Sequence, residues 1–373
     1  MSQRAGLKPL TRERRAHSFR IGRIAGIDIR IHFTFLLLVG LFAVAGTAPG
    51  GPGALGAVLW LAIIFGCVIV HELAHCLVGR SRGAVVHEIE LLPIGGVSKL
   101  EKLPEGPADE FAMAIAGPAA SLGIAIGAAL LALVFAQPVL PVDMFGGPLL
   151  ARIMWFNLLV AAFNLLPAFP LDGGRVFRAL LERRHDLETA TRVAARVGRW
   201  MAIVFIAFGL FWNIWLLIIG IFVYFGATAE EAATIVHVRL ARRRVGDVML
   251  LDPVTVDPAT PDADFRALVR HSAQRVFPVV GPEGYEGIVD ADMIEHGDAR
   301  GTVADVVERA APVVAATDGL EACLPLVVSV PARALAVVDV DGRVVGLLRG
   351  EDITRVLERV AAARASTNGS IGR

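Results

Sequence analysis

The stretch that decides the fold reads AVLWLAIIFGCVIVHELAHCLV and covers residues 57–78. Up to Val70 it has no charged side chain, and a helix of about 20 apolar residues is long enough to cross the hydrocarbon core of a bilayer. Directly after this run come His71 and Glu72, followed by His75. The stretch therefore predicts a transmembrane helix with two imidazoles and a carboxyl group near one end.

The composition of the whole chain agrees with a membrane protein. Hydrophobic residues make up 55% of the 373 residues, charged residues make up 19%, and the mean hydropathy is +0.61. The 36 Lys and Arg balance the 36 Asp and Glu, so no excess of basic charge indicates a nucleic-acid partner. The cysteines are too few and too scattered for a disulfide framework or a paired Cys-x-x-Cys zinc site, since they are Cys67, Cys76 and Cys323.

Apolar runs dominate the chain up to about residue 229, and we expect six of them to be transmembrane helices. The apolar stretch 200–227 is too long for one upright helix. We divide it at Trp212-Asn213 into two helices, the first of which starts near Ala194. The other four predicted helices cover residues 31–48, 54–78, 108–136 and 153–167.

The distribution of Lys and Arg predicts the orientation of these helices, because short loops rich in basic residues stay in the cytoplasm. Basic clusters precede the first helix and follow the second, fourth and sixth, whereas the alternate loops contain Arg152 as their one basic residue. We therefore expect a multi-pass protein of the cell membrane with its N- and C-termini in the cytoplasm. The stretch from Arg4 to Arg23 lacks the apolar core of a signal peptide, so we expect it to be retained.

The histidines of the decisive stretch have the spacing of a metal site. Side chains four positions apart lie on one face of a helix, so His71 and His75 can bind one metal ion with Glu72 beside it. Neutral imidazoles are typical zinc ligands, and a carboxylate that is not itself a ligand can act as a general base. The alternative, two core histidines without a metal, would leave Glu72 desolvated in the membrane without a function.

A catalytic zinc ion usually has three protein ligands and one open position, so a third ligand is required. Asp172 is the main candidate, because two prolines break the helix before it and two glycines follow it. Irregular backbone of this kind is tolerated at membrane depth inside protein or beside water. An ordinary cytoplasmic Asp-Gly turn is the alternative, and His87 and Glu110 are other candidate ligands that look less confined.

These motifs resemble those of the site-2 protease family of intramembrane zinc metalloproteases. The resemblance covers roughly residues 22–229 and rests on His71-Glu-Leu-Ala-His75, Gly95-Gly96, Ala116-Gly-Pro-Ala-Ala-Ser121, Asn164-Leu-Leu-Pro167 and Leu171-Asp-Gly-Gly-Arg175. It implies that His71, His75 and Asp172 bind one Zn2+ ion per chain. It also implies Glu72 as the general base and Asn164 as a polar group near the attacking water or the scissile carbonyl.

The family's substrates are single-pass transmembrane proteins within the membrane lipid, such as anti-sigma factors, and a helical substrate must unwind before its peptide bonds can be cleaved. Residues 85–100 are a candidate binding element. Their apolar side chains alternate and Gly95-Gly96 can form a tight turn, so we expect a β-hairpin or a re-entrant loop whose edge pairs with an extended substrate. A purely structural loop is the alternative, and the resemblance favours the substrate role.

The chain after Arg244 contains an internal repeat with an offset of roughly 60 residues. The segment 276–289 is similar to the segment 334–348, and each copy predicts a strand, a helix, two strands and a helix. The pair resembles tandem cystathionine-β-synthase (CBS) domains, which often bind adenine nucleotides. Neither copy could bury its apolar faces alone, so we expect one packed module.

The expected nucleotide site departs from the CBS pattern Gly-x-x-Thr-x-x-Asp. The first repeat has Asp290 and Met293 at the Thr and Asp positions, and the second has Arg349 at the Thr position but keeps Asp352. Asp352 is therefore the candidate ribose-binding residue. The module could bind an adenine nucleotide at this residue. The alternative is that it acts without a ligand, in homodimer formation or regulatory docking.

The sequence as a whole predicts a polytopic α-helical membrane protein with about six transmembrane helices and a soluble α/β tandem CBS module. Its predicted function is that of a zinc metalloendopeptidase in regulated intramembrane proteolysis. The alternatives are a CBS-regulated metal-ion transporter or channel and an inactive scaffold. The expected boundaries are a cytoplasmic N-terminal segment 1–30, a metalloprotease domain 31–230, a linker 231–244, CBS domains 245–363 and a disordered tail 364–373.

Overall fold

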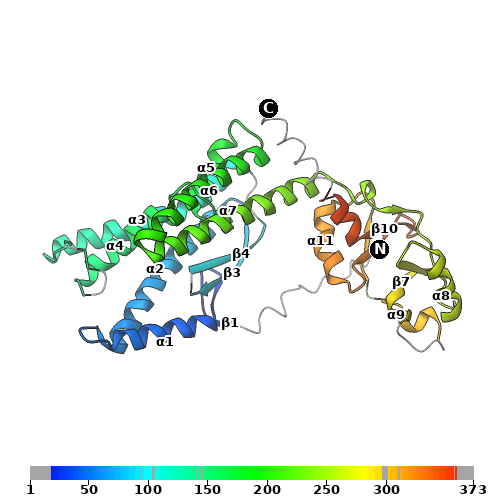
Figure 1. Cartoon of the computed structure of the whole chain (residues 1–373), viewed down its shortest axis with the longest axis horizontal. Coiled ribbons are helices and arrows are strands. Elements are labelled where there is room, and N and C mark those ends of the chain that lie inside the picture. The colour runs from blue at the N-terminus through cyan, green and yellow to red at the C-terminus, as the bar shows by residue number, and fades with distance from the viewer. Residues whose placement is uncertain are drawn as a thin grey trace. The chain divides into compact units, whose positions relative to one another are not determined.

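The chain forms two compact units, Met1–Thr234 and Ile235–Arg373, and each is described by itself (Figure 1). The expected tail after residue 363 and the first 17 residues of the expected N-terminal segment lie outside the described residues. The computed structural model describes residues 18–93, 95–102, 106–140, 142–143, 146–295, 301–309, 311–356 and 358.

Apolar helices make up most of the first unit. Two of them, α1 (Thr34–Gly46) and α4 (Leu149–Asn164), have 13 and 16 residues and are shorter than an upright span requires. The predicted fold class, a helical membrane protein with a CBS module, is confirmed. Among the described residues, the helices long and apolar enough to cross a membrane are α2 (Gly53–Ser81), α3 (Pro107–Val134), α6 (Leu187–Trp212) and α7 (Ile214–Ala241).

The last two apolar helices divide at the predicted position. α6 ends at Trp212 and α7 begins at Ile214. Asn213 between them has extended backbone, with φ −157° and ψ 111°, and its Oδ1 accepts a hydrogen bond from the backbone N–H of Trp215 at 2.9 Å. This side chain therefore caps the start of α7.

The start of α6 lies earlier than predicted. The helix begins at Leu187 and not near Ala194. The carboxylate of Asp186 accepts a hydrogen bond from the backbone N–H of Thr189 at 3.1 Å and caps the helix. Hydropathy marks only the apolar part of a helix, so it does not reveal such polar first turns.

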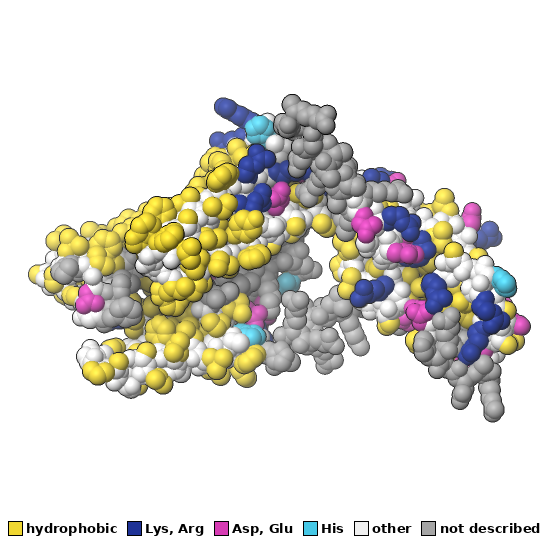
Figure 2. All heavy atoms as spheres, viewed as in Figure 1, with side chains coloured by type: hydrophobic (Ala, Val, Ile, Leu, Met, Phe, Trp, Pro, Cys, Tyr) yellow, Lys and Arg dark blue, Asp and Glu magenta, His cyan; other side chains and the backbone are white. Residues whose placement is uncertain are grey.

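The outer and inner faces of the helices differ in side-chain size. Large apolar side chains cover the outside, as the yellow surface in Figure 2 shows, and Leu37, Leu133 and Phe211 are 71%, 78% and 75% exposed. Such exposure indicates contact with lipid. The buried positions of α6 are small residues, which allow helices to approach closely, and they are Ala190, Thr191, Ala194, Ala195, Gly198, Ala202 and Gly209.

A four-stranded sheet packs against α1 and α2. β3 and β4 form the predicted hairpin, and β2 runs parallel to β3. In the order β1-β2-β3-β4, the strand β4 lies at one edge of the described sheet. The strands are β1 (Ser18–Ile24), β2 (Ile27–His32), β3 (Val85–Leu92) and β4 (Gly95–Lys102).

The hairpin β1–β2 was not foreseen from the sequence. The sequence predicted a cytoplasmic segment up to residue 30 and a transmembrane helix from residue 31, whereas β2 extends to His32 and α1 begins at Thr34. The alternating residues Ile27 and Ile29 are nevertheless buried, and they belong to one apolar cluster with Phe65 of α2. The sheet is therefore anchored to the helix that carries the histidines.

The second unit contains two hairpins in the positions of the predicted repeat. β6 (Val276–Gly281) pairs with β7 (Gly284–Asp290), and β9 (Ala334–Val338) pairs with β10 (Val344–Arg349). β5 (Leu250–Leu251) precedes both hairpins and yet pairs with β10, which agrees with the expectation of one packed module. The remaining elements are β8 (Val313–Ala315), η2 (Val245–Asp247), α8 (Asp262–His271), α9 (Ala291–Glu295), α10 (Val303–Val306) and α11 (Leu320–Ser329).

Candidate metal centre

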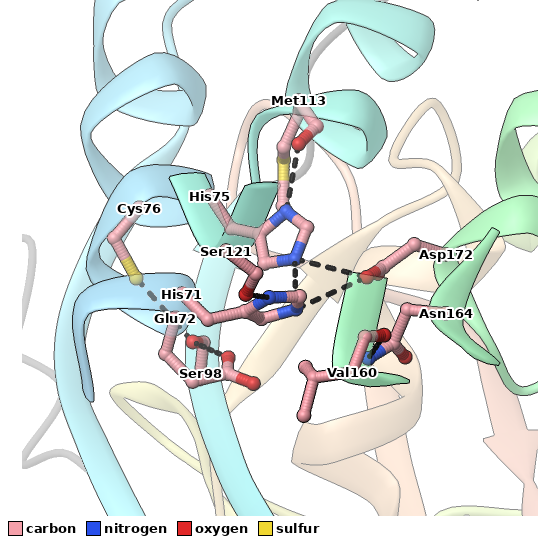
Figure 3. A network of polar contacts seen from close by, with 10 residues as sticks. All are labelled: His71, Glu72, His75, Cys76, Ser98, Met113, Ser121, Val160, Asn164 and Asp172. Atoms are coloured by element: carbon pink, nitrogen blue, oxygen red, sulfur yellow. Dashed lines mark hydrogen bonds and ion pairs between the residues drawn. The ribbon is translucent and has the colours of Figure 1, made fainter. Parts of the chain in front are cut away.

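Three side chains from distant parts of the sequence meet inside the helical unit (Figure 3). Nε2 of His71 lies 3.2 Å from Nε2 of His75, and each of these atoms lies 3.2 Å from Oδ2 of Asp172. Both imidazoles are buried, and the side chain of Asp172 is 18% exposed. Within the described ranges, this is the one group of three His, Cys, Asp or Glu donors that could hold a metal ion.

The backbone after α4 brings the carboxylate to the two histidines of α2. Asp172 is the first residue of α5 (Asp172–Leu181), after the irregular segment 165–171. A Cβ added at Gly174 would lie 2.6 Å from the backbone nitrogen of Phe169, closer than Cβ atoms approach. A glycine is therefore required for the chain to fold back tightly at this point.

Hydrogen bonds on the opposite ring nitrogens orient both imidazoles. Nδ1 of His75 lies 2.7 Å from the carbonyl oxygen of Met113, and because a carbonyl only accepts, this Nδ1 carries the proton. The neutral ring then has an unprotonated Nε2 facing Asp172. Nδ1 of His71 lies 3.0 Å from Oγ of Ser121. Both partners are on α3, and contacts of this kind fix the orientation of metal-binding histidines.

α3 approaches the imidazoles most closely at Gly117. A Cβ at this position would collide with Nε2 of His75 and would lie 2.6 Å from Nε2 of His71. The two imidazoles therefore pack directly on the backbone of α3, in the place that a side chain at position 117 would take.

The donor set fits a zinc ion. In a tetrahedral zinc site with bonds of about 2.1 Å, neighbouring donor atoms are roughly 3.4 Å apart. The three donor atoms here are 3.2 Å apart. Two neutral imidazoles and a carboxylate leave the fourth position open, which is the ligand chemistry of a catalytic zinc site.

Glu72 lies beside the donor group without belonging to it. Its Oε2 accepts a hydrogen bond from Oγ of Ser98 on β4 at 2.8 Å. Figure 3 shows its carboxylate next to Ser98, apart from the carboxylate of Asp172. The predicted general base is therefore close to the donors and is held by the edge strand of the sheet.

Asn164, the last residue of α4, lies on the Asp172 side of the cluster (Figure 3). Its Nδ2 donates a hydrogen bond to the carbonyl oxygen of Val160 at 3.1 Å, within its own helix. The side chain thus lies near the site but does not bind the donor group in this structure.

The other candidate residues lie away from the cluster. His87 is on β3 and Glu110 is on α3, and neither belongs to the donor group. Oε1 of Glu110 accepts a hydrogen bond from Nε of Arg178, a buried residue of α5, at 3.0 Å. Asp352 is in the second unit, where it accepts hydrogen bonds from the side chain of Arg349.

Sequence reasoning did not identify the residues that support the donors. Ser121 belongs to a family motif in the sequence, but its contact with His71 depends on the fold. Ser98, which binds Glu72, belongs to no such motif. The Met113 carbonyl carries no signal in the sequence, because a backbone oxygen is present at every position. Gly117 and Ser121 are small residues four positions apart, so they lie on one face of α3. This spacing is the signal in the sequence that could have predicted a close approach of α3 to the histidines.

Comparison with known proteins identifies two family models in the chain. The model described as Peptidase family M50 matches residues 59–147 and 143–208. The model described as CBS domain matches residues 245–295 and 303–359. The first match lies within the first unit and the second lies within the second unit.

Curated relatives match over most of the chain. A zinc metalloprotease of Methanocaldococcus jannaschii is 32% identical over 81% of this chain and 85% of the relative. The putative zinc metalloprotease Rip3 of Mycobacterium tuberculosis is 32% identical over 91% of this chain and 92% of the relative. Among solved structures, the site-2 protease from Methanocaldococcus jannaschii is 35% identical and covers 58% of this chain and 95% of its own, with a TM-score of 0.45.

A methyl group at position 117 should weaken metal binding. In Gly117→Ala the added Cβ pushes the two imidazoles away from their positions, so we expect the zinc affinity to fall by about 10- to 100-fold, as when ligand orientation is disturbed. Zinc per chain after dialysis against a chelator, determined by mass spectrometry of the metal, measures the effect. Gly123→Ala is the matched control, since no atom lies within 4 Å of its added Cβ. Equal zinc retention in the two variants would contradict this account of the site.

Proposed function

The chain belongs to peptidase family M50, the family of site-2 zinc metalloproteases, and we propose that it hydrolyses peptide bonds within or near the transmembrane segments of single-pass membrane proteins. The observation that carries this proposal is the donor group inside a bundle of apolar helices, with Glu72 beside it. Ionisable groups in such a place are costly unless they are used. A zinc peptidase would use the donor group to bind the metal and Glu72 to accept a proton.

We assign His71, His75 and Asp172 as the ligands of one zinc ion per chain. When bound, zinc would polarise the scissile carbonyl and lower the pKa of the attacking water. The Met113 carbonyl and Ser121 keep the rings turned so that both Nε2 atoms face the carboxylate. These contacts therefore hold both imidazoles in one orientation.

Glu72 is assigned as the general base. It follows a metal-binding histidine directly in α2 but stays outside the donor group. Its carboxylate can therefore accept a proton from the attacking water and transfer it to the nitrogen of the leaving amine.

We assign Asn164 as a polar group that binds the substrate oxygen. In this structure its Nδ2 binds the carbonyl oxygen of Val160. Rotation of the side chain would let the same amide donate to the substrate oxygen as negative charge develops on it. Asn164 would then exchange an intrahelical hydrogen bond for a substrate contact.

We assign β4 as the strand that receives the substrate. It lies at the edge of the described sheet, and its residues Gly96 and Ser98 lie against Glu72. A helical substrate hides its peptide bonds. An unwound segment that paired with this edge would instead be extended and bound through its backbone next to the general base.

We propose a cell-membrane location with both termini in the cytoplasm. The metal donors lie near the end of α2 that carries Arg80, and basic residues of short loops mark the cytoplasmic side. A short aqueous path from the cytoplasm would then supply water to the site. Cleavage would release a cytoplasmic fragment, as regulated proteolysis of an anti-sigma factor requires.

We propose that the CBS module regulates the protease through protein contacts, including homodimer formation, without a nucleotide at Asp352. Arg349 stands where the CBS pattern has Thr, and it donates from Nη2 and Nε to the two oxygens of Asp352 at 2.7 and 2.8 Å. These hydrogen bonds raise the pKa of Arg349, so its guanidinium stays charged at neutral pH. The carboxylate that would bind a ribose is already occupied, and an adenine nucleotide does not fit this repeat.

Replacement of the general base should abolish cleavage and leave the metal in place. In Glu72→Gln we expect the cleavage rate to fall by at least about 100-fold, because the amide cannot accept the proton. The substrate is a quenched fluorescent peptide with one transmembrane segment interrupted by Gly-Pro, in detergent micelles, and zinc per chain is measured on the same samples. Glu283→Gln, an exposed glutamate of the CBS module, is the control. Ion flux into vesicles that depends on Glu72, without any cleavage by the wild type, would instead support a transporter.

Adenosine monophosphate should not bind the wild-type module. We expect no shift in the melting temperature of the full chain at millimolar concentrations, because Arg349 occupies Asp352. Arg349→Ala removes both side-chain hydrogen bonds that Arg349 donates to Asp352, and Arg343→Ala, an exposed arginine of the same hairpin, is the control. A shift in the wild type that Asp352→Asn removes would contradict the proposal and assign the nucleotide to this site.

A further inference from the structure

We propose that Ser98 is a positioning residue that holds the general base from the strand to which the substrate binds. The proposal rests on the proposed function, in which Glu72 accepts the proton of the attacking water. It assigns a role to a residue that belongs to none of the zinc-protease motifs in the sequence.

The hydroxyl of Ser98 has a defined direction. Its Oγ donates a hydrogen bond to Oε2 of Glu72 at 2.8 Å, so the hydroxyl proton points to Glu72. The buried thiol of Cys76 donates to the same Oγ at 3.3 Å. The hydroxyl is therefore fixed from both sides, as Figure 3 shows, and it in turn fixes one oxygen of the carboxylate.

The strand also limits the position of Glu72 by contact. Gly96 lies two residues before Ser98, so both face the same side of β4. A Cβ added at Gly96 would lie 2.5 Å from Cγ and 3.1 Å from Cδ of Glu72. The backbone of β4 thus packs directly on the stem of the carboxylate, while Ser98 determines the direction of its oxygens.

This arrangement ties the base to the edge of the sheet. β4 pairs with β3 on one side, Gly96 opposite Leu91 and Ser98 opposite Ile89. A substrate segment that pairs with the other side would hold the backbone of β4 between two strands. Ser98 would transmit that restraint to Glu72, so the base would be best oriented when a substrate strand is in place. Loss of the hydroxyl should therefore lower kcat and leave KM nearly unchanged.

The test compares Ser98→Ala with Ser98→Thr in full-length, zinc-loaded protein and uses the same quenched transmembrane peptide. We expect kcat to fall by about 10-fold in Ser98→Ala, as expected for loss of a hydrogen bond to a charged group. KM and zinc per chain should stay at the wild-type values. Ser98→Thr keeps the hydroxyl and should recover most of the rate. Ser81→Ala is the control, because the Oγ of this exposed serine binds the carbonyl oxygen of Val78 at the end of α2.

The possible results separate this inference from the proposed function. If Ser98→Ala cleaves as fast as the wild type while Glu72→Gln is inactive, the role of Ser98 is overturned and the protease assignment stands. A rise in KM at constant kcat, or a loss of zinc in both Ser98 variants, would give Ser98 a substrate-binding or structural role and would also overturn the inference. If zinc-loaded wild type does not cleave the peptide, both proposals fall.

Discussion

The burial of two imidazoles and a carboxylate at one point among apolar helices is the constraint on which the helical unit depends. The donor atoms are 3.2 Å apart, and lone pairs and negative charge at that distance need a cation or protons between them. The neighbouring elements are built around this requirement. α3 supplies a carbonyl and a hydroxyl to the outer ring nitrogens and a glycine where the rings come closest.

Hydrogen bonds and an ion pair of Arg178 attach α5, the helix that begins with Asp172, to neighbouring helices. The guanidinium of Arg178 on α5 donates to Glu110 of α3 and, from Nη1, to Thr234 of α7 at 3.2 Å. Glu230 of α7 lies 3.6 Å from the same guanidinium. A buried arginine of this kind is stable only when its partners are in place, so α5 is tied to two helices. These contacts therefore fix the position of α5, and with it the position of the Asp172 carboxylate.

Local patterns made much of this predictable. The four-residue spacing of His71 and His75 requires only that the segment is a helix, and the apolar run before it makes it one. The prolines and glycines around Asp172 predicted irregular backbone, and Gly95-Gly96 indicated a tight turn, which the hairpin β3–β4 contains. The division at Asn213 was visible because a polar residue interrupts an apolar run that is too long for one helix.

The features that escaped prediction depend on contacts between distant segments. Ser98 and Glu72 are 26 positions apart and meet only because β4 packs on α2. The hairpin β1–β2 joins the sheet by parallel pairing with β3, a partner that no local pattern specifies. In the CBS module, the sequence showed that Arg349 replaces a Thr, but only the fold shows that its side chain turns back onto Asp352.

The central claim is that Asp172 completes a three-ligand zinc site, and zinc per chain in purified wild type and in Asp172→Ala tests it most directly. The account predicts about one zinc ion per chain in the wild type and a strongly reduced content in the variant, since a catalytic zinc site needs three protein ligands. Zinc retention unaffected by the loss of Asp172, or carefully prepared wild type without zinc, would contradict it.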